Sequence, residues 1–159
     1  MLMNLDLSGN KLSNVDGGFA GLRELSRLDL RTNRLTEITQ FTFRDQVNLR
    51  YLLLSENFIS YVDRRAFRNL EKLTYLVLRK NPISAVERFQ FHSPFLSYVD
   101  LSECGLTAVP RGLPASIRYL QLRRNNISVI HQSSLRDCNQ VSILVLDENS
   151  ISEVSHSVC

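Results

Sequence analysis

The sequence predicts a curved α/β solenoid: a right-handed coil with a concave parallel β-sheet of about seven short strands and a mostly irregular convex side. Leucine supplies 26 of the 159 residues, about one in six, and this excess is the main anomaly of the composition. A leucine-containing frame also recurs at a nearly constant interval along the whole chain. Regular self-similarity of this kind is typical of architectures in which similar units stack in one direction.

The repeated frame has the spacing L-x-x-L-x-L-x-x-N-x-L and is first met between Leu2 and Leu12. Its seven copies begin near residues 2, 25, 49, 73, 96, 117 and 141. A frame of five positions matched seven times without a gap defines a leucine-rich repeat solenoid. We therefore expect residues 1–159 to form a single leucine-rich repeat domain.

Each copy should contribute one strand and one buried polar residue. The L-x-L segment alternates inward and outward positions, as a short strand requires, and stacked copies should form a parallel sheet. The turn after each strand leaves backbone groups in a dry interior, where an asparagine amide can bond both donors and acceptors. The predicted ladder comprises Asn10, Asn33, Asn57, Asn81, Cys104, Asn125 and Asn149. Cys104 is interpreted as a structural residue of similar bulk, not as a reactive thiol.

A second column of large apolar residues should stack on the far side of the coils. Four phenylalanines recur once per repeat at a constant interval, and Leu135 occupies the matching position of the sixth copy. The four are Phe19, Phe43, Phe67 and Phe91. The fifth copy is shorter and carries Leu113 between Pro110 and Pro114, which predicts an extended path there.

Repeats of this length with a late phenylalanine resemble the typical class of extracellular leucine-rich repeats. That class includes Toll-like receptor ectodomains, lamprey variable lymphocyte receptors and small leucine-rich proteoglycans. The short fifth repeat is similar to the short proline-containing repeats of the proteoglycans. The resemblance implies an extracellular, secreted or cell-surface scaffold that binds a matrix protein, a growth factor or a receptor.

Proteins of these families carry cysteine-bearing caps at both ends, because terminal coils expose apolar faces. Here the first strand begins at Leu2 and the sequence stops at Cys159, so both caps are apparently lacking and no signal peptide is present in this segment. Uncapped ends predict self-association. Cys138 is expected to be a buried free thiol, with a disulfide to Cys159 as the alternative.

The sequence offers no constellation for catalysis, a metal or a cofactor. His92, His131 and His156 lie in different coils without metal-ligand spacing, and neither a nucleophile elbow nor a phosphate-binding glycine loop occurs. No apolar run approaches the roughly 18 residues of a membrane span. One sequon, Asn126-Ile127-Ser128, makes Asn126 a candidate glycosylation site that should face outward.

The outward positions of the strands form the candidate binding face. Four of the five tyrosines fall in one column of that face, and tyrosine and arginine are enriched at binding hot spots. Tyrosine is also favoured on strands for structural reasons alone. Leu53 and Val77 are expected to be exposed beside the tyrosines as an apolar patch. The candidate ligand-binding residues are Tyr51, Leu53, Tyr75, Val77, Arg79, Tyr98, Asp100, Tyr119, Gln121 and Arg123.

We therefore predict a non-catalytic protein-binding scaffold that uses its concave face. The alternative is an intracellular leucine-rich repeat adaptor or regulatory subunit, which would also explain the unpaired cysteines. Nucleic acid and sulfated glycan are disfavoured as ligands, because the net charge is only +3 and acidic residues interrupt the basic ones in each coil. No membrane insertion by this segment is expected.

Overall fold

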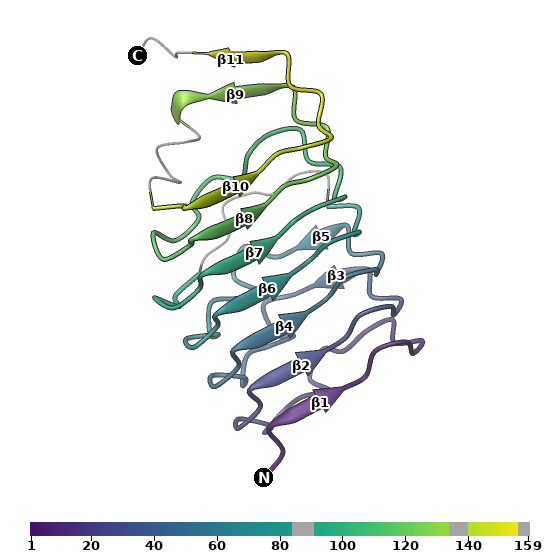
Figure 1. Ribbon diagram of the computed structural model, residues 1–159. Coiled ribbons are helices and arrows are strands. Elements are labelled where there is room, and N and C mark those ends of the chain that lie inside the picture. Colours follow the sequence, from purple (N-terminus) through teal and green to yellow (C-terminus); the bar gives the residue numbers. More distant parts are fainter. Residues whose placement is uncertain (84–90, 134–139, 156–159) are drawn as a thin grey trace.

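One parallel sheet of seven strands forms the concave side of a curved coil (Figure 1). The computed structural model describes residues 1–83, 91–133 and 140–155. The strands follow the order of the chain: β1 (Asn4–Asp6), β2 (Arg27–Asp29), β4 (Tyr51–Leu53), β6 (Tyr75–Val77), β7 (Tyr98–Asp100), β8 (Tyr119–Gln121) and β10 (Ile143–Val145). The predicted sheet, with one short strand per repeat, is confirmed.

The register of the sheet follows the repeat frame without a slip. The central residue of each strand pairs with its equivalent in the next, so that Leu28 lies beside Leu52 and Leu52 beside Leu76. After the strands, the backbone N–H of Leu54 still donates to the carbonyl of Val77 at 2.8 Å. Because a shift by one residue would expose every leucine, the apolar pattern holds this register in place.

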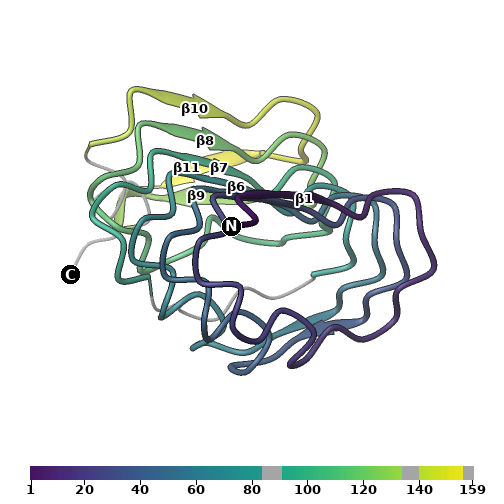
Figure 2. The same cartoon turned by 90° about the horizontal axis from the view of Figure 1, so that it is seen from below.

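The convex side carries little regular structure, as predicted. Two short parallel pairs run there, β3 (Glu37–Ile38) with β5 (Tyr61–Val62) and β9 (Val129–His131) with β11 (Glu153–Ser155). Figure 2 shows the coils crossing between the two sides around a common interior. Among the described residues, helix is confined to residues 132–133.

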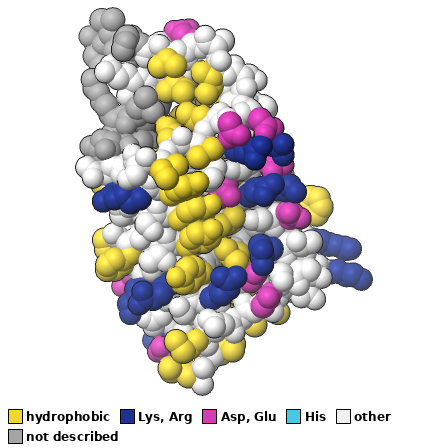
Figure 3. All heavy atoms as spheres, viewed as in Figure 1, with side chains coloured by type: hydrophobic (Ala, Val, Ile, Leu, Met, Phe, Trp, Pro, Cys, Tyr) yellow, Lys and Arg dark blue, Asp and Glu magenta, His cyan; other side chains and the backbone are white. Residues whose placement is uncertain are grey.

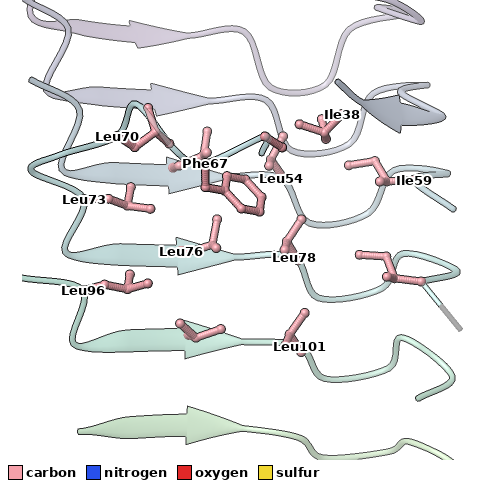
Figure 4. Packing of buried hydrophobic residues seen from close by; sticks show 14 of the residues in the cluster. Ile38, Leu54, Ile59, Phe67, Leu70, Leu73, Leu76, Leu78, Leu96 and Leu101 are labelled. Atoms are coloured by element: carbon pink, nitrogen blue, oxygen red, sulfur yellow. The ribbon is translucent and has the colours of Figure 1, made fainter. Parts of the chain in front are cut away.

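The core is a stack of leucine layers, each in contact with the coils before and after it. Leu73, Leu76 and Leu78 of the fourth repeat are completely buried, as are Leu96 and Leu101 of the fifth. Figure 4 shows these side chains pointing from successive strands into the same interior. Each coil therefore buries its apolar face only against its neighbours, as in other repeat proteins.

The phenylalanine column packs on the other side of this interior. Phe19 and Phe43 stack with ring centroids 6.4 Å apart, and Phe67 and Phe91 stack at 5.4 Å. Phe43 and Phe67 are 1% exposed. The predicted column is therefore present, whereas its sixth member, Leu135, lies outside the described residues.

The fifth repeat crosses the convex side in irregular turns and bends, and the apolar side chains of Val109 and Leu113 are buried there. Bends at Arg111 and Gly112, between Pro110 and Pro114, therefore interrupt the extended path that its prolines predicted. The predictions for Cys138, His156 and Cys159 fall outside the described residues.

The asparagine ladder joins neighbouring coils through both ends of each amide. Asn57 donates from Nδ2 to the carbonyls of Leu54, in its own coil, at 3.0 Å and of Leu30, in the preceding coil, at 2.9 Å. Its Oδ1 accepts from the backbone N–H of Leu35 at 3.1 Å. The same pattern recurs at Asn33, Asn81, Asn125 and Asn149.

Two members of the ladder differ from the prediction that all are buried. Asn10 is exposed and bonds only to the carbonyls of Leu7 and Ser8, in its own coil, because the described structure has no coil before it. Asn149 is only half-buried. The burial of a ladder residue therefore depends on coils packed on both sides of it.

Cys104 is a ladder residue with fewer bonds. Its thiol donates to the carbonyls of Leu78 and Ser102 at 3.4 and 3.5 Å. The amide oxygen that accepts a backbone N–H at the other ladder positions is replaced here by sulfur, which is a weak acceptor. The N–H of Ile83, equivalent to those that bond asparagine oxygens elsewhere, turns to the carbonyl of Asn81 instead, at 2.8 Å. Burial raises the pKa of the Cys104 thiol to about 12, consistent with the structural interpretation.

The residue before each ladder position adopts a left-handed backbone conformation. Gly9 occupies this position in the first coil, with φ of 69°. In the six other coils the residue is not glycine: Thr32, Glu56, Lys80, Glu103, Arg124 and Glu148, with φ between 52° and 57°. The sharp turn that brings the asparagine inward imposes this conformation. Residues that have a Cβ adopt it at a cost in conformational energy.

Candidate functional site: the concave face

The register aligns the outward side chains of the sheet into columns that cross the strands. The first column runs through Asn4, Arg27, Tyr51, Tyr75, Tyr98, Tyr119 and Ile143. The second runs through Asp6, Asp29, Leu53, Val77, Asp100, Gln121 and Val145. Figure 3 shows hydrophobic side chains, a class that includes tyrosine there, as a band over the strands, with charged side chains gathered beside it.

Four tyrosines on consecutive strands form a stacked ladder. The rings of Tyr75 and Tyr98 lie 4.1 Å apart with 9° between their planes, and those of Tyr98 and Tyr119 lie 5.1 Å apart at 15°. Tyr51 joins at 6.1 Å but is tilted by 43° from Tyr75. Burial and the Tyr75 hydroxyl raise the pKa of Tyr98, which stays protonated as a hydrogen-bond donor. The inner rings therefore stack with their faces against one another. What they present to a partner is their edges and hydroxyl groups.

Leu53 and Val77 are not the exposed patch that the sequence predicted. They are 7% and 9% exposed. Tyrosines and arginines line the same space as these two residues, and long side chains of this kind can cover apolar surface with their methylene groups. The two residues instead form the floor of a hollow.

This hollow has a volume of about 370 Å³ and spans the second to the fifth coil. Its lining residues are Arg27, Arg31, Tyr51, Leu53, Ser55, Tyr75, Val77, Arg79 and Asp100. Six of the ten candidate residues thus come together in it, whereas Tyr98, Tyr119, Gln121 and Arg123 lie outside its lining. The hollow also contains three residues that the candidate set missed: Arg27, Arg31 and Ser55. Arg27 occupies the same repeat position as Tyr51, and Arg31 and Ser55 occupy that of Arg79.

Acidic side chains hold the arginines of this face. Arg31 donates to the buried carboxylate of Asp29 at 2.7 Å from Nη2, and Arg27 lies 3.6 Å from the same group. Arg79 contacts Glu103 at 2.6 Å, and the pKa of that carboxyl lies below its usual range because Arg79 donates to it. Hydrogen bonds to carboxylates therefore orient Arg31 and Arg79, whereas Arg27 makes only the longer ion contact.

The left-handed turn positions carry alternating charges from the third coil to the seventh. Glu56, Lys80, Glu103, Arg124 and Glu148 follow one another in this column. Lys80 lies 3.4 Å from Glu56, and Arg123 and Arg124 both pair with Glu148. Hydrogen bonds from Arg124 and Arg123 lower the pKa of Glu148 to about 2. Much of the charge beside the band is thus neutralised within the chain.

Asn126 is exposed, as expected, and its own backbone N–H bonds the carbonyl of Leu106 at 2.7 Å. Across residues 1–83, 91–133 and 140–155, no group of three or more His, Cys, Asp and Glu is arranged to hold a metal. The helical residues in these ranges give no segment long and apolar enough to cross a membrane.

Comparisons with known proteins agree with this architecture. The leucine rich repeat family model matches residues 23–83. Decorin from Homo sapiens and decorin from Canis lupus familiaris are each 39% identical to the chain over 61 residues. That alignment covers 38% of this chain but only 17% of decorin, so the chain matches a small part of that protein.

Solved structures match almost the whole chain. The Toll–Spatzle complex of Drosophila contains a chain that superposes with a TM-score of 0.86 and 26% identity, covering 98% of this chain and 23% of that one. TLR13 in its complex with ssRNA13 gives 0.80 and 25%, with coverage of 97% and 21%. The leucine-rich repeat domain of APL1B gives 0.80 and 24%, with coverage of 97% and 46%. The chain therefore has the leucine-rich repeat fold of these structures, and part of it is similar in sequence to decorin.

Proposed function

We propose that this leucine-rich repeat chain is a non-catalytic scaffold that binds a protein partner on its concave face. The stacked tyrosine ladder beside the arginine-lined hollow carries the proposal. Tyrosine and arginine dominate binding hot spots, because they combine large contact areas with oriented hydrogen bonds. The ladder is already ordered by ring stacking, so less side-chain entropy is lost when a partner binds.

The partner class we favour is a matrix protein, a growth factor or a receptor met outside the cell. The similarity to decorin and to the matched chain of the Toll–Spatzle complex supports an extracellular setting. In that setting the exposed Asn126 would carry an N-linked glycan. An intracellular adaptor is the alternative, and a mass loss on glycosidase treatment of protein secreted from mammalian cells would exclude it.

Single-stranded RNA is a second candidate, since the TLR13 neighbour is solved with ssRNA13. Proteins that bind single strands without sequence preference stack the bases on exposed aromatic faces. Here the faces of Tyr75 and Tyr98 cover each other at 4.1 Å. The ladder therefore offers edges and hydroxyls, which suit the mixed polar and apolar surface of a protein better than a base.

The test replaces Tyr75 and Tyr98 together by alanine. A partner is first captured by chemical crosslinking and identified by mass spectrometry, and its purified form is then bound to the chain on a sensor surface. We expect affinity to fall at least about tenfold with little change in far-UV circular dichroism. Tyr61→Ala is the matched control, because Tyr61 is 55% exposed on β5 of the convex side. Unchanged affinity of the double variant would refute the concave-face proposal.

A further inference from the structure

We infer that the hollow of the concave face recognises an acidic side chain of the protein partner, with an adjacent apolar side chain seated on Leu53 and Val77. The inference rests on the proposed function and specifies what the partner must present. It follows from the positions of three arginines, from the carboxylates that orient two of them and from the apolar floor between them.

Guanidinium groups border the hollow on both sides. Arg27 and Arg31 come from the second coil and Arg79 from the fourth, and all three line the same space. Their side chains are 43%, 48% and 44% exposed, so their polar ends reach solvent. Asp100 is the acidic residue of the lining. The face that a partner meets is therefore richer in positive donors than in carboxylates.

The carboxylates that balance these arginines lie beneath or beside them. Asp29 is 1% exposed, so it is covered from the solvent and a partner meets Arg31 before it meets Asp29. Arg31 uses Nε and Nη2 on Asp29, and Arg79 uses Nε and Nη2 on Glu103. The Nη1 group of each arginine makes no hydrogen bond to any described residue. It can donate to a further anion.

The orientation of the arginines reduces the cost of binding such an anion. A free arginine loses considerable rotamer freedom when it is fixed, but Arg31 and Arg79 are already held by two donors each. Charge-assisted hydrogen bonds to a carboxylate are stronger than neutral ones. A lysine or arginine of a partner placed here would instead meet three positive groups, which disfavours basic ligands.

The floor of the hollow sets the second requirement. Leu53 and Val77 lie side by side in the register of the sheet, and Tyr51 and Tyr75 stand beside them in the neighbouring column. This floor is apolar and shielded, so contact with an apolar group is favourable because it buries further apolar surface. A charged group placed there would lose hydration without gaining a hydrogen bond from the floor. A partner segment that carries an aspartate or glutamate next to a leucine, isoleucine or phenylalanine satisfies both requirements.

The experiment uses a phage library of short random peptides selected on the immobilised chain and counter-selected on the Tyr75→Ala/Tyr98→Ala variant. We expect the surviving peptides to be enriched in Asp or Glu beside a large apolar residue. The most enriched peptide is then synthesised and titrated against the chain. Arg27→Gln and Arg79→Gln should each weaken it about tenfold. Arg64→Gln, an exposed arginine outside the hollow, should leave it unchanged.

The outcomes separate this inference from the proposed function. Peptides that lose binding with the tyrosine variant but not with Arg27→Gln or Arg79→Gln would refute the acidic ligand and leave the concave face as the binding surface. Failure to obtain any peptide that depends on the tyrosines would count against the proposed function itself. Heparin, a sulfated glycan, is tested as a competitor of the peptide. If heparin displaces the peptide and its own binding depends on Arg27 and Arg79, the assignment of the hollow to a protein side chain is overturned.

Discussion

The amide oxygen of Asn57 accepts a hydrogen bond from the backbone N–H of Leu35, in the preceding coil, at 3.1 Å. This contact and its equivalents tie each coil to the one before it. They satisfy backbone groups at the turns, where the sheet has ended and water does not reach.

Replacing Asn57 by alanine should destabilise the chain strongly. The change leaves the N–H of Leu35 without its acceptor. It also removes one of two amide donors from the carbonyls of Leu30 and Leu54, which keep the amides of Asn33 and Asn81. An unsatisfied buried N–H costs about 1–3 kcal/mol and each lost hydrogen bond about 1 kcal/mol, so we expect a loss of at least about 2 kcal/mol in the free energy of unfolding, measured with urea. Asn10→Ala is the control and should cost under about 1 kcal/mol, since Asn10 is exposed. Equal losses for both variants would contradict the ladder.

Replacing Cys104 by asparagine should stabilise the chain. The new amide oxygen could accept from the N–H of Ile83, which now bonds the carbonyl of Asn81. The amide would also supply two N–H donors to the carbonyls that now share one thiol hydrogen. One additional hydrogen bond predicts a gain of about 1 kcal/mol in the free energy of unfolding. Cys104→Ala should act in the opposite direction, because it removes the thiol and leaves a cavity. A lower midpoint for Cys104→Asn in thermal unfolding would show that cysteine is preferred there for its packing.

Thr32→Gly should raise stability even though it shortens a side chain. Thr32 is β-branched, is exposed and has φ of 54°. Relief of a left-handed conformation is worth about 1–2 kcal/mol, and the greater entropy of glycine in the unfolded chain offsets part of it. We expect a net gain of about 0.5–1 kcal/mol by calorimetry.

Gly9 provides the reciprocal control for that change. It occupies the equivalent turn with φ of 69°, and a Cβ added there would meet no atom within 4 Å. Gly9→Thr should therefore destabilise the chain through backbone strain alone. Stabilisation by Gly9→Thr would show that strain does not govern these positions.

The ion pairs of Glu148 should make stability depend on pH in the acidic range. Hydrogen bonds from Arg124 and Arg123 lower the pKa of Glu148 from 4.5 to about 2 in the folded chain. A depressed folded-state pKa contributes stability above the unfolded value, and that stability is lost as the pH falls through the folded value. We expect the stability gap between the chain and Glu148→Gln to be complete at neutral pH and to close between about pH 4.5 and 2.

Urea unfolding of both proteins at a series of pH values measures this gap. Glu24→Gln serves as the control, because no ion pair among the described residues involves Glu24. A gap for Glu148→Gln that stays constant down to the lowest pH would show that its ion pairs do not stabilise the fold.

The sequence by itself determined the solenoid, its strand positions, its register and the two interior columns. It could do so because every repeat meets the same local requirements: an alternating apolar strand, a turn and an amide that bonds the preceding coil. Tyr51, Tyr75, Tyr98 and Tyr119 were predicted to form a column for the same reason, since a parallel sheet in register aligns equivalent residues.

Only the tertiary structure decided which outward residues are accessible. Leu53 and Val77 occupy outward positions of their strands, yet tyrosine and arginine side chains from neighbouring coils surround them and make them a floor. The inclusion of Arg27 and Arg31 in the hollow, the bonds of Arg31 to the buried Asp29 and the alternating charges of the turns also depend on packing between coils. Alternation along a strand fixes the side to which a residue points, whereas its exposure depends on neighbours in other coils, which are distant in the chain.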